Sequence, residues 1–229
     1  MEMTLNKDYF SVCANDLIKA QQKLNLREMQ LLQIAISQIK KDDSELLEYT
    51  TTASELAKFL NTDIHNIYKD YKKITDNLMK SIVYVMIDGK ERKFQWVSNC
   101  DYDTKTKEIV IQLHDKLKPF LIGLNKLYTQ IELSTLIKFK SYYSIRLYQL
   151  IVCEYGARKK TDFELTIDEI RKFFGIDEEQ YKLTADLLRY TLKMAINEIN
   201  TLDEVSIKQY EEIKSGRKIK LVKFKAVWL

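Results

Sequence analysis

Apolar residues recur at intervals of three and four along residues 166–200, which is the spacing of one buried face of an α-helix. The pattern predicts two helices with a short break at residues 175–177. The apolar positions are Ile167, Ile170, Phe173 and Phe174 in the first helix, and Tyr181, Ala185, Leu188, Leu192, Ala195, Ile196 and Ile199 in the second. Opposite this stripe, Lys182, Arg189 and Lys193 fall close to one line, since successive residues turn by about 100°. Two packed helices with a basic outer stripe are typical of a helix-turn-helix that enters a DNA major groove.

The same pattern occurs earlier in the chain. Residues 52–61 match residues 166–175 at an offset of 114 positions. At this offset the apolar positions Ile67, Tyr71, Ile74, Leu78 and Ile82 align with Tyr181, Ala185, Leu188, Leu192 and Ile196. The outer face of the earlier second helix carries Lys69, Lys72, Lys73 and Lys80. A repeat that keeps both an apolar and a basic stripe indicates duplication of one module.

Segments typical of β-strands flank each helix pair. Residues 46–51 and 162–165 predict a short strand before the first and the second pair. After the pairs, β-branched and aromatic residues predict strands at 82–87, 94–100 and 108–113, and again at 205–210 and 219–224. Asp88–Gly89 is a hairpin turn signal. A helix pair followed directly by β-hairpins is the order of a winged helix.

Basic residues gather at the predicted hairpin tips. They are Lys90, Arg92, Lys93, Lys105 and Lys107 in the first module, and Arg217 and Lys218 in the second. Such tips can lie along a DNA backbone and contact phosphates. The alternative is a solvated turn that is rich in lysine for solubility, and the sequence does not separate the two.

Three further helices complete the prediction. Residues 15–40 predict helix with a break near Asn25, residues 116–128 a short helix, and residues 133–155 a long helix with Lys140 and Arg146 near its polar middle. We therefore predict an α+β fold of two tandem winged-helix domains, each a helix-turn-helix plus β-hairpin, related by duplication. Residues 1–130 would form an N-terminal domain that binds DNA and dimerises, and residues 131–229 a C-terminal DNA-binding domain.

The amino-acid composition is compatible with this fold and argues against a long flexible linker and a membrane span. The 229 residues are 45% hydrophobic and 31% charged, enough for a core and a soluble surface. Only 5 Gly and 1 Pro are present, which argues against a long flexible linker. No apolar run approaches the ~20 residues of a membrane span, and the polar start of the chain shows no signal peptide. The net charge of +4 permits nucleic-acid binding, but the local basic stripes carry more information.

Residues that would support catalysis, a cofactor or a metal are scarce. The 3 cysteines are far apart, and with 2 histidines they form no zinc ligand set of ordinary spacing; free thiols fit a cytoplasm. There is no GxxxxGK phosphate loop. Carboxylate pairs such as Asp42–Asp43 and Asp101–Asp103 lie in turns, where helix-terminus and turn chemistry explains them. We therefore predict that the protein is not an enzyme and uses no cofactor and no metal.

Three motifs resemble those of a known family. They are NDLI at residues 15–18 with LRE at 26–28, KSYYSIRLYQL at 140–150, and AINEIN at 195–200 followed by GRK at 216–218. The second is the most specific, because the family pattern resembles K-S-x-Y-x-x-R-L-Y-x-L. On these motifs the chain resembles, from about Asn15 onward, the plasmid replication initiators of the iteron-binding type, Rep proteins with two tandem winged helices.

The resemblance implies a function in bacterial plasmid replication. It implies binding to double-stranded DNA at short direct repeats of a plasmid origin, opening of nearby A·T-rich DNA, and recruitment of the host initiator and the replicative helicase. It also implies that monomers initiate replication whereas dimers repress the protein's own gene, and that the protein is cytoplasmic. One position departs from the family: Arg189 stands alone where the second recognition helix often carries a pair of basic residues.

The candidate DNA-binding residues combine the basic stripes, the family motif and one hairpin tip. They are Lys69, Lys72, Lys73, Lys80, Lys140, Arg146, Lys182, Arg189, Lys193, Arg217 and Lys218. Arg189 is the candidate for a guanine contact, because its fork suits O6 and N7, and the lysines are candidates for phosphate contacts. Asp76 and Asp186 lie among the lysines and weaken the positive field.

Two alternatives remain open at this point. The same fold serves transcriptional regulators that bind a palindrome as a stable dimer and have no effect on origin melting. It also serves winged-helix scaffolds that bind protein through their hairpins. Dimerisation is expected in the first module, where residues 83–87 or 96–100 could pair edge to edge with a second copy.

Overall fold

The computed structural model describes residue 6 and residues 8–229, which form two compact units. The first unit holds the described residues up to Leu17 together with Leu24–Lys138, and the second holds Ile18–Lys23 together with Phe139–Leu229. The chain therefore divides after Lys138, eight positions later than the predicted boundary. In addition, the six residues Ile18–Lys23, here called the strap, belong to the second unit although they precede most of the first.

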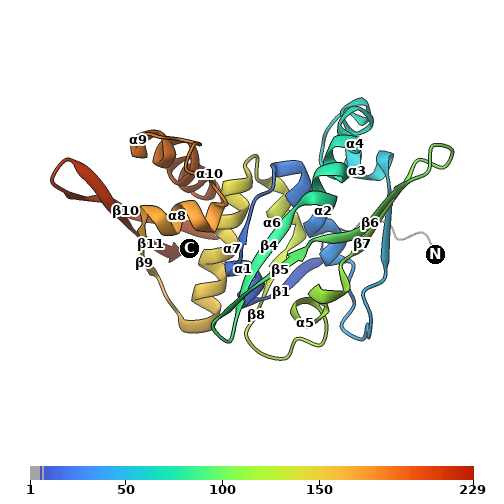
Figure 1. Ribbon diagram of the computed structural model, residues 1–229, viewed down its shortest axis with the longest axis horizontal. Helices are drawn as coiled ribbons and strands as arrows, with labels where there is room; N and C mark the ends of the chain where they lie inside the picture. The colour runs from blue at the N-terminus through green and yellow to red at the C-terminus, as the bar shows by residue number, and fades with distance from the viewer. Residues whose placement is uncertain (1–5, 7) are drawn as a thin grey trace. The chain divides into compact units, whose positions relative to one another are not determined.

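The first unit combines antiparallel strands with several helices, two of which form its helix pair (Figure 1). Its strands are β1 (Phe10–Ala14), β3 (Glu48–Thr52), β4 (Ile82–Ile87), β5 (Lys90–Gln95), β6 (Val97–Tyr102), β7 (Glu108–Leu113) and β8 (Tyr128–Glu132). Its helices are α2 (Leu26–Ser37), α3 (Ala53–Phe59), α4 (Ile64–Lys80), the short 3₁₀ turn η1 (Asp115–Leu117), α5 (Lys118–Leu121) and α6 (Leu133–Lys138). Helix α1 (Asn15–Lys19) runs from this unit into the strap.

The second unit repeats the plan with one long supporting helix. Its helices are α7 (Tyr142–Arg158), α8 (Ile167–Phe174), α9 (Thr184–Leu188), the π-helical turn η2 (Arg189–Lys193) and α10 (Met194–Ile199). Its strands are β2 (Gln21–Gln22) in the strap, β9 (Asp162–Thr166), β10 (Val205–Ser215) and β11 (Lys218–Trp228). Segments α9, η2 and α10 follow one another without a gap, and we call them together the second recognition helix.

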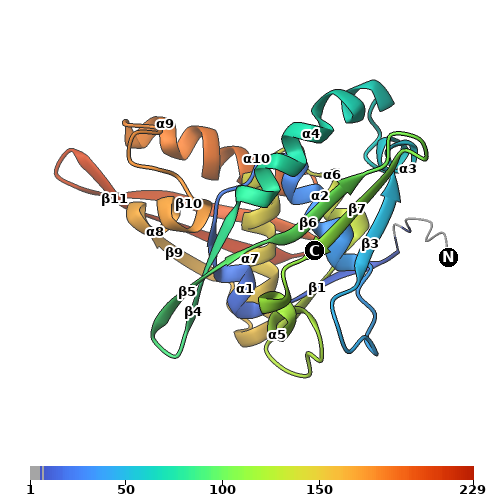
Figure 2. The same cartoon turned by 45° about the vertical axis from the view of Figure 1, so that its right-hand side comes forward.

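Both units contain the same three-stranded antiparallel sheet. In each, the strand before the helix pair joins the last strand of the wing, and the earlier wing strand lies at the edge, giving the orders β3-β7-β6 and β9-β11-β10. Figure 2 shows the β10–β11 hairpin reaching past the helices of its own unit. The predicted order of strand, helix pair and wing is therefore present twice.

An additional hairpin separates the first helix pair from its wing. Strands β4 and β5 pair from Ile82 opposite Gln95 to Ile87 opposite Lys90. The turn residues Asp88 and Gly89 both have positive φ, 51° and 72°, which matches the right-handed twist of the strands they join. The predicted strand at residues 94–100 is therefore two strands, which part at the buried Trp96.

The first helix of each pair begins with the same capping box. The Thr52 hydroxyl accepts a hydrogen bond from the Glu55 amide at 3.1 Å, and the Thr166 hydroxyl accepts one from the Glu169 amide at 3.2 Å. In return, the carboxylate of each glutamate accepts a hydrogen bond from the threonine backbone amide, so that otherwise unpaired donors at the helix start are satisfied. The bonds to Thr166 hold the pKa of Glu169 below its usual value.

The buried side of the second recognition helix differs in part from the prediction. Leu188, Leu192, Ala195, Ile196 and Ile199 are buried as expected, but Ala185 is exposed and Tyr181 is half-buried and lies before the helix. Leu187 and Thr191 are buried instead. The buried positions repeat every four residues, and a regular α-helix of 3.6 residues per turn would rotate such a stripe away from the core. The wider π-helical turn η2 offsets that rotation, which keeps one face on α7.

Two helical predictions need correction at their ends. The predicted helix at 133–155 is two helices, because Ser141 accepts a hydrogen bond from the Tyr143 amide and starts α7 anew. The predicted break at 175–177 extends to residue 183, so the second recognition helix begins at Thr184. Strands β1 and β8, which pair with each other, were not predicted.

No helix among the described residues has the length and apolar character needed to cross a lipid bilayer.

Candidate DNA interface

Helix α4 presents the basic residues of the first unit. Its 17 residues bury Ile67, Tyr71, Ile74 and Leu78 toward the core. The four predicted lysines all have exposed side chains, and within the described residues none makes an ion pair; they are Lys69, Lys72, Lys73 and Lys80. Exposed Asp70 and Asp76 lie among them, which lowers the positive potential of this face.

The three basic residues predicted for the stripe of the second helix pair have different surroundings. Arg189 is exposed on the second recognition helix, with its guanidinium carbon 5.3 Å from the centre of the Tyr190 ring. Lys193 lies on the same helix and makes an ion pair with Glu212 of β10 at 2.7 Å. Lys182 precedes the helix and pairs with Glu179 at 2.9 Å, in a fully solvated setting where such pairs contribute little. Of the three, only Arg189 is without an acidic partner among the described residues.

The Lys193 ammonium group is held over the wing. It lies 5.3 Å from the centre of the Tyr210 ring, and the Tyr210 hydroxyl donates to the carboxylate of Glu212. The hydrogen bond from Lys193 is the main reason that the pKa of Glu212 lies below its usual value. The carboxylate therefore stays ionised at neutral pH, and Lys193 has a persistent counter-charge.

The hairpin tips divide into two kinds. Arg217 and Lys218 are exposed at the tip of the β10–β11 wing, and Lys105 and Lys107 lie in the turn of the β6–β7 wing. Lys90, Arg92 and Lys93 lie instead on β5, in the additional hairpin. Of the predicted tip residues, the structure thus places Lys105, Lys107, Arg217 and Lys218 at a wing tip, and the three on β5 elsewhere.

Lys140 and Arg146, both from the KSYYSIRLYQL motif, have unlike environments. The Lys140 side chain is exposed in the break between α6 and α7, where its backbone amide bonds the Glu198 carboxylate. Arg146 is fully buried, with 0% of its surface exposed. Its two terminal nitrogens donate to the carbonyls of Ile18 and Ala20, each at 2.7 Å, and its guanidinium carbon lies 4.3 Å from the centre of the Phe173 ring. The prediction that Arg146 contacts DNA is therefore wrong: it anchors the strap.

Sequence reasoning missed several exposed side chains beside the predicted ones. Lys214 and Lys220 flank the tip of the β10–β11 wing. Tyr190 and Met194 are 46% and 38% exposed on the second recognition helix, next to Arg189 and Lys193. Exposed apolar groups on such a helix suit the methyl group of thymine. Their exposure could have been predicted in part, because Tyr190 and Met194 lie on the side of the helix opposite the buried Leu192 and Ile196.

Metal-binding groups do not gather in the part of the chain that the structure describes. No cluster of three or more His, Cys, Asp or Glu side chains there is arranged to hold an ion. None of the three cysteines, all of which the structure describes, forms a disulfide, and two of them are buried.

Comparison with known proteins agrees with this architecture. The family model described as "Initiator Replication protein, WH1" matches residues 12–152, and the one described as "Initiator Rep protein, WH2" matches residues 166–226. Among solved structures, the chain is similar to "Crystal structure of Pi initiator protein in complex with iteron DNA", with a TM-score of 0.74 and 22% identity. The similarity covers 97% of this chain and 98% of that chain. The chain thus belongs to the initiator replication protein family and carries both of its winged-helix domains, WH1 and WH2.

Proposed function

We propose that this protein initiates plasmid replication by binding double-stranded direct repeats, the iterons, at the plasmid origin. The observation that carries the proposal is the duplicated unit: in a chain of the initiator family, each copy presents an exposed helix with basic side chains and a wing beside it. The similar Pi initiator protein was crystallised in complex with iteron DNA. Helix α4 and the second recognition helix would each enter a major groove.

The side chains divide the work of binding by their chemistry. Arg189 has an exposed, planar guanidinium, which can donate two parallel hydrogen bonds to O6 and N7 of guanine. The exposed lysines of α4, with Arg217 and Lys218 at the wing tip, would contact phosphates. Affinity would then depend steeply on salt, because each neutralised phosphate releases condensed counterions.

The remaining steps belong to the same proposal. Binding would promote opening of A·T-rich origin DNA and recruit the host initiator and the replicative helicase, in the bacterial cytoplasm. A homodimer in equilibrium with the monomer would repress the protein's own gene. Of the two segments predicted to pair, residues 97–100 lie on β6, an edge strand of its sheet, whereas Val83 and Val85 of β4 are fully buried. The β6 edge is therefore the better dimerisation candidate.

Replacing Arg189 with alanine tests the proposed function. The wild-type protein should protect direct repeats in DNA that flanks its gene. Arg189→Ala should bind a repeat-containing duplex about 10- to 100-fold more weakly, while its affinity for a random duplex falls only about twofold. Lys182→Ala is the control, since a phosphate contact should weaken both duplexes alike. Both affinities are measured by fluorescence anisotropy at matched salt.

Three outcomes of that experiment would contradict parts of the proposal. Equal losses of Arg189→Ala on both duplexes would remove its base-reading role. Protection of a palindrome by a stable dimer, with no effect on origin melting, would indicate a transcriptional regulator. Failure of the wild type to bind any duplex at low salt would indicate a protein-binding scaffold.

The Lys193–Glu212 pair allows a separate prediction. Glu212→Gln should strengthen binding to a random duplex several-fold and steepen the dependence of log K on log salt by about one unit, because it frees Lys193 for a phosphate. Glu211→Gln is the control, because it removes the same charge from the neighbouring exposed position. If both variants change affinity and salt dependence equally, net charge alone is responsible. Titrations at several salt concentrations measure both quantities.

A further inference from the structure

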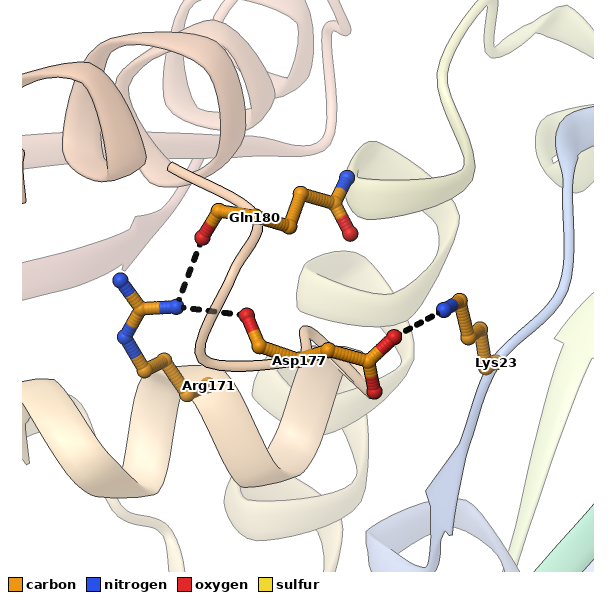
Figure 3. Close-up of polar contacts among 4 residues, drawn as sticks. All are labelled: Lys23, Arg171, Asp177 and Gln180. Carbon is orange, nitrogen blue, oxygen red and sulfur yellow. Dashed lines mark hydrogen bonds and ion pairs between the residues drawn. The ribbon is translucent and has the colours of Figure 1, made fainter. Parts of the chain in front are cut away.

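The side chain of Arg171 organises the turn between the two helices of the second pair. Its terminal nitrogens donate to three backbone carbonyls: those of Asp177 at 3.0 Å, Gln180 at 2.9 Å and Tyr181 at 2.6 Å. Figure 3 shows the guanidinium on α8 reaching the first two of these carbonyls across the turn. A charged donor that bonds three carbonyls of one loop fixes its backbone more firmly than neutral contacts would.

The strap holds the other side of this turn. Lys23 makes an ion pair with the Asp177 carboxylate (Figure 3), so Asp177 is bound through its carbonyl to Arg171 and through its side chain to the strap. Gly175 has φ of +65°, and a Cβ there would lie 2.2 Å from the Gln22 carbonyl oxygen. The Tyr142 hydroxyl donates to that same oxygen at 2.8 Å. The turn is thus enclosed between α8 and the strap.

The turn places the ring of Tyr181 against the second recognition helix. Tyr181 adopts a left-handed backbone conformation, with φ of +54°, which is costly for a bulky residue unless its surroundings impose it. Its ring stacks on that of Tyr190, with centroids 5.9 Å apart and planes inclined by 22°. The Arg189 guanidinium lies against Tyr190. The contacts therefore run from Arg171 through Tyr181 and Tyr190 to Arg189.

The second recognition helix does not fix its own start. Leu183, at its N-cap position, makes no capping hydrogen bond with its side chain, whereas α3 and α8 each begin with a full capping box. The orientation of its first turn must then come from the preceding segment, which Arg171 holds. A group that reads bases needs support that keeps it within about 0.5 Å of its productive position.

We propose that Arg171 is a positioning residue for sequence-specific DNA recognition by the second unit, acting on Arg189 through Tyr181 and Tyr190. The inference rests on the proposed function, since it assigns a role within DNA binding. It differs from a phosphate contact, because both terminal nitrogens of Arg171 are engaged by protein carbonyls. Loss of Arg171 should consequently reduce discrimination between DNA sequences more than it reduces overall attraction to DNA.

Paired variants on α8 separate positioning from charge. Arg171→Gln removes the three-carbonyl contact, and Lys172→Gln removes the same charge from the next, exposed residue of the helix. Each variant is titrated with a repeat-containing duplex and with a random duplex at several salt concentrations. Arg171→Gln should lower the ratio of specific to non-specific affinity about tenfold. Lys172→Gln should leave that ratio within about twofold of wild type.

A second variant removes the ring and spares the turn. Tyr181→Asn keeps a residue that tolerates positive φ, while it eliminates the stacking on Tyr190. It should reproduce the loss of specificity, and it replaces Arg171→Gln as the deciding variant if that protein does not fold by circular dichroism. In the double variant, the fold-loss in the ratio of specific to non-specific affinity should be smaller than the product of the two separate fold-losses. The reason is that both substitutions interrupt the same series of contacts from Arg171 to Arg189.

The outcomes are distinct for the two proposals. An unchanged affinity ratio for folded Arg171→Gln and Tyr181→Asn, or the same salt-dependent loss as in Lys172→Gln, would overturn the positioning role while the wild type still binds the repeats. If the wild type itself does not distinguish the repeats from random DNA, the proposed function fails, and the positioning role fails with it.

Discussion

Replacing Arg146 with leucine should lower the free energy of unfolding of the second unit by about 3 kcal/mol or more. The substitution keeps an apolar stem but removes the donors that satisfy the carbonyls of Ile18 and Ala20. It also removes the packing of the guanidinium on Phe173. Two buried backbone acceptors would lose their partners, and the strap would lose two of its hydrogen bonds to α7.

Hydrogen exchange and chemical unfolding together measure this effect. Amides of the strap should exchange much faster in Arg146→Leu than in wild type, and the second unit should unfold at lower urea concentration. Arg158→Leu is the matched control: it removes an exposed arginine from the last turn of the same helix, where Arg158 makes a 3.9 Å ion pair with Glu154. Its expected cost is within about 0.5 kcal/mol of zero. Similar costs for both variants would show that the buried bonds add no stability.

Arg146 also shows where sequence reasoning reached its limit. An arginine in the motif of a DNA-binding family looks like a DNA contact when only the sequence is considered. The two carbonyls that accept its hydrogen bonds belong to residues 128 and 126 positions away in the chain. No local pattern encodes such a pairing. The strap itself was unpredictable for the same reason, since residues 18–23 read as part of a helix that belongs to the first unit.

Features encoded within a few residues were predictable. The helix pairs begin where Thr52 and Thr166 are followed three residues later by glutamate, and the capping boxes form at both places. The Asp88–Gly89 turn likewise joins two strands, because its backbone conformation is a local property. The duplicated winged-helix plan followed from the repetition of such local signals.

The second recognition helix was predicted only in part, for a reason that lies in its geometry. Apolar periodicity assumes a regular α-helix, whereas the π-helical turn η2 adds to the residues per turn in the middle of this one. The same assumption put Tyr181 on the helix, although its left-handed backbone ends the preceding turn. The ion pair of Lys193 could not be predicted from the helix either, because its partner Glu212 comes from a strand of the wing.

Among the glycines, Gly175→Ala should be the most disruptive substitution to alanine, with a loss of about 3 kcal/mol in the stability of the second unit. Two effects combine there. The backbone has φ of +65°, which disfavours any side chain, and the new Cβ would lie 2.2 Å from the Gln22 carbonyl oxygen and 2.8 Å from its carbon. These are backbone atoms, which cannot rotate away as a flexible side chain can, so the strap itself would have to move.

Gly216→Ala isolates the first effect from the second. Gly216 has φ of +60° at the tip of the β10–β11 wing, and no heavy atom lies within 4 Å of the position its Cβ would take. Its expected cost is about 1 kcal/mol, the cost of a left-handed conformation alone. The excess measured for Gly175→Ala in urea unfolding is therefore the cost of displacing the strap, and faster exchange of the strap amides should accompany it. An equal cost for both variants would mean that the strap moves aside freely. In that case it could not brace the turn that Arg171 holds from the other side, and that turn would depend on α8 alone for its position.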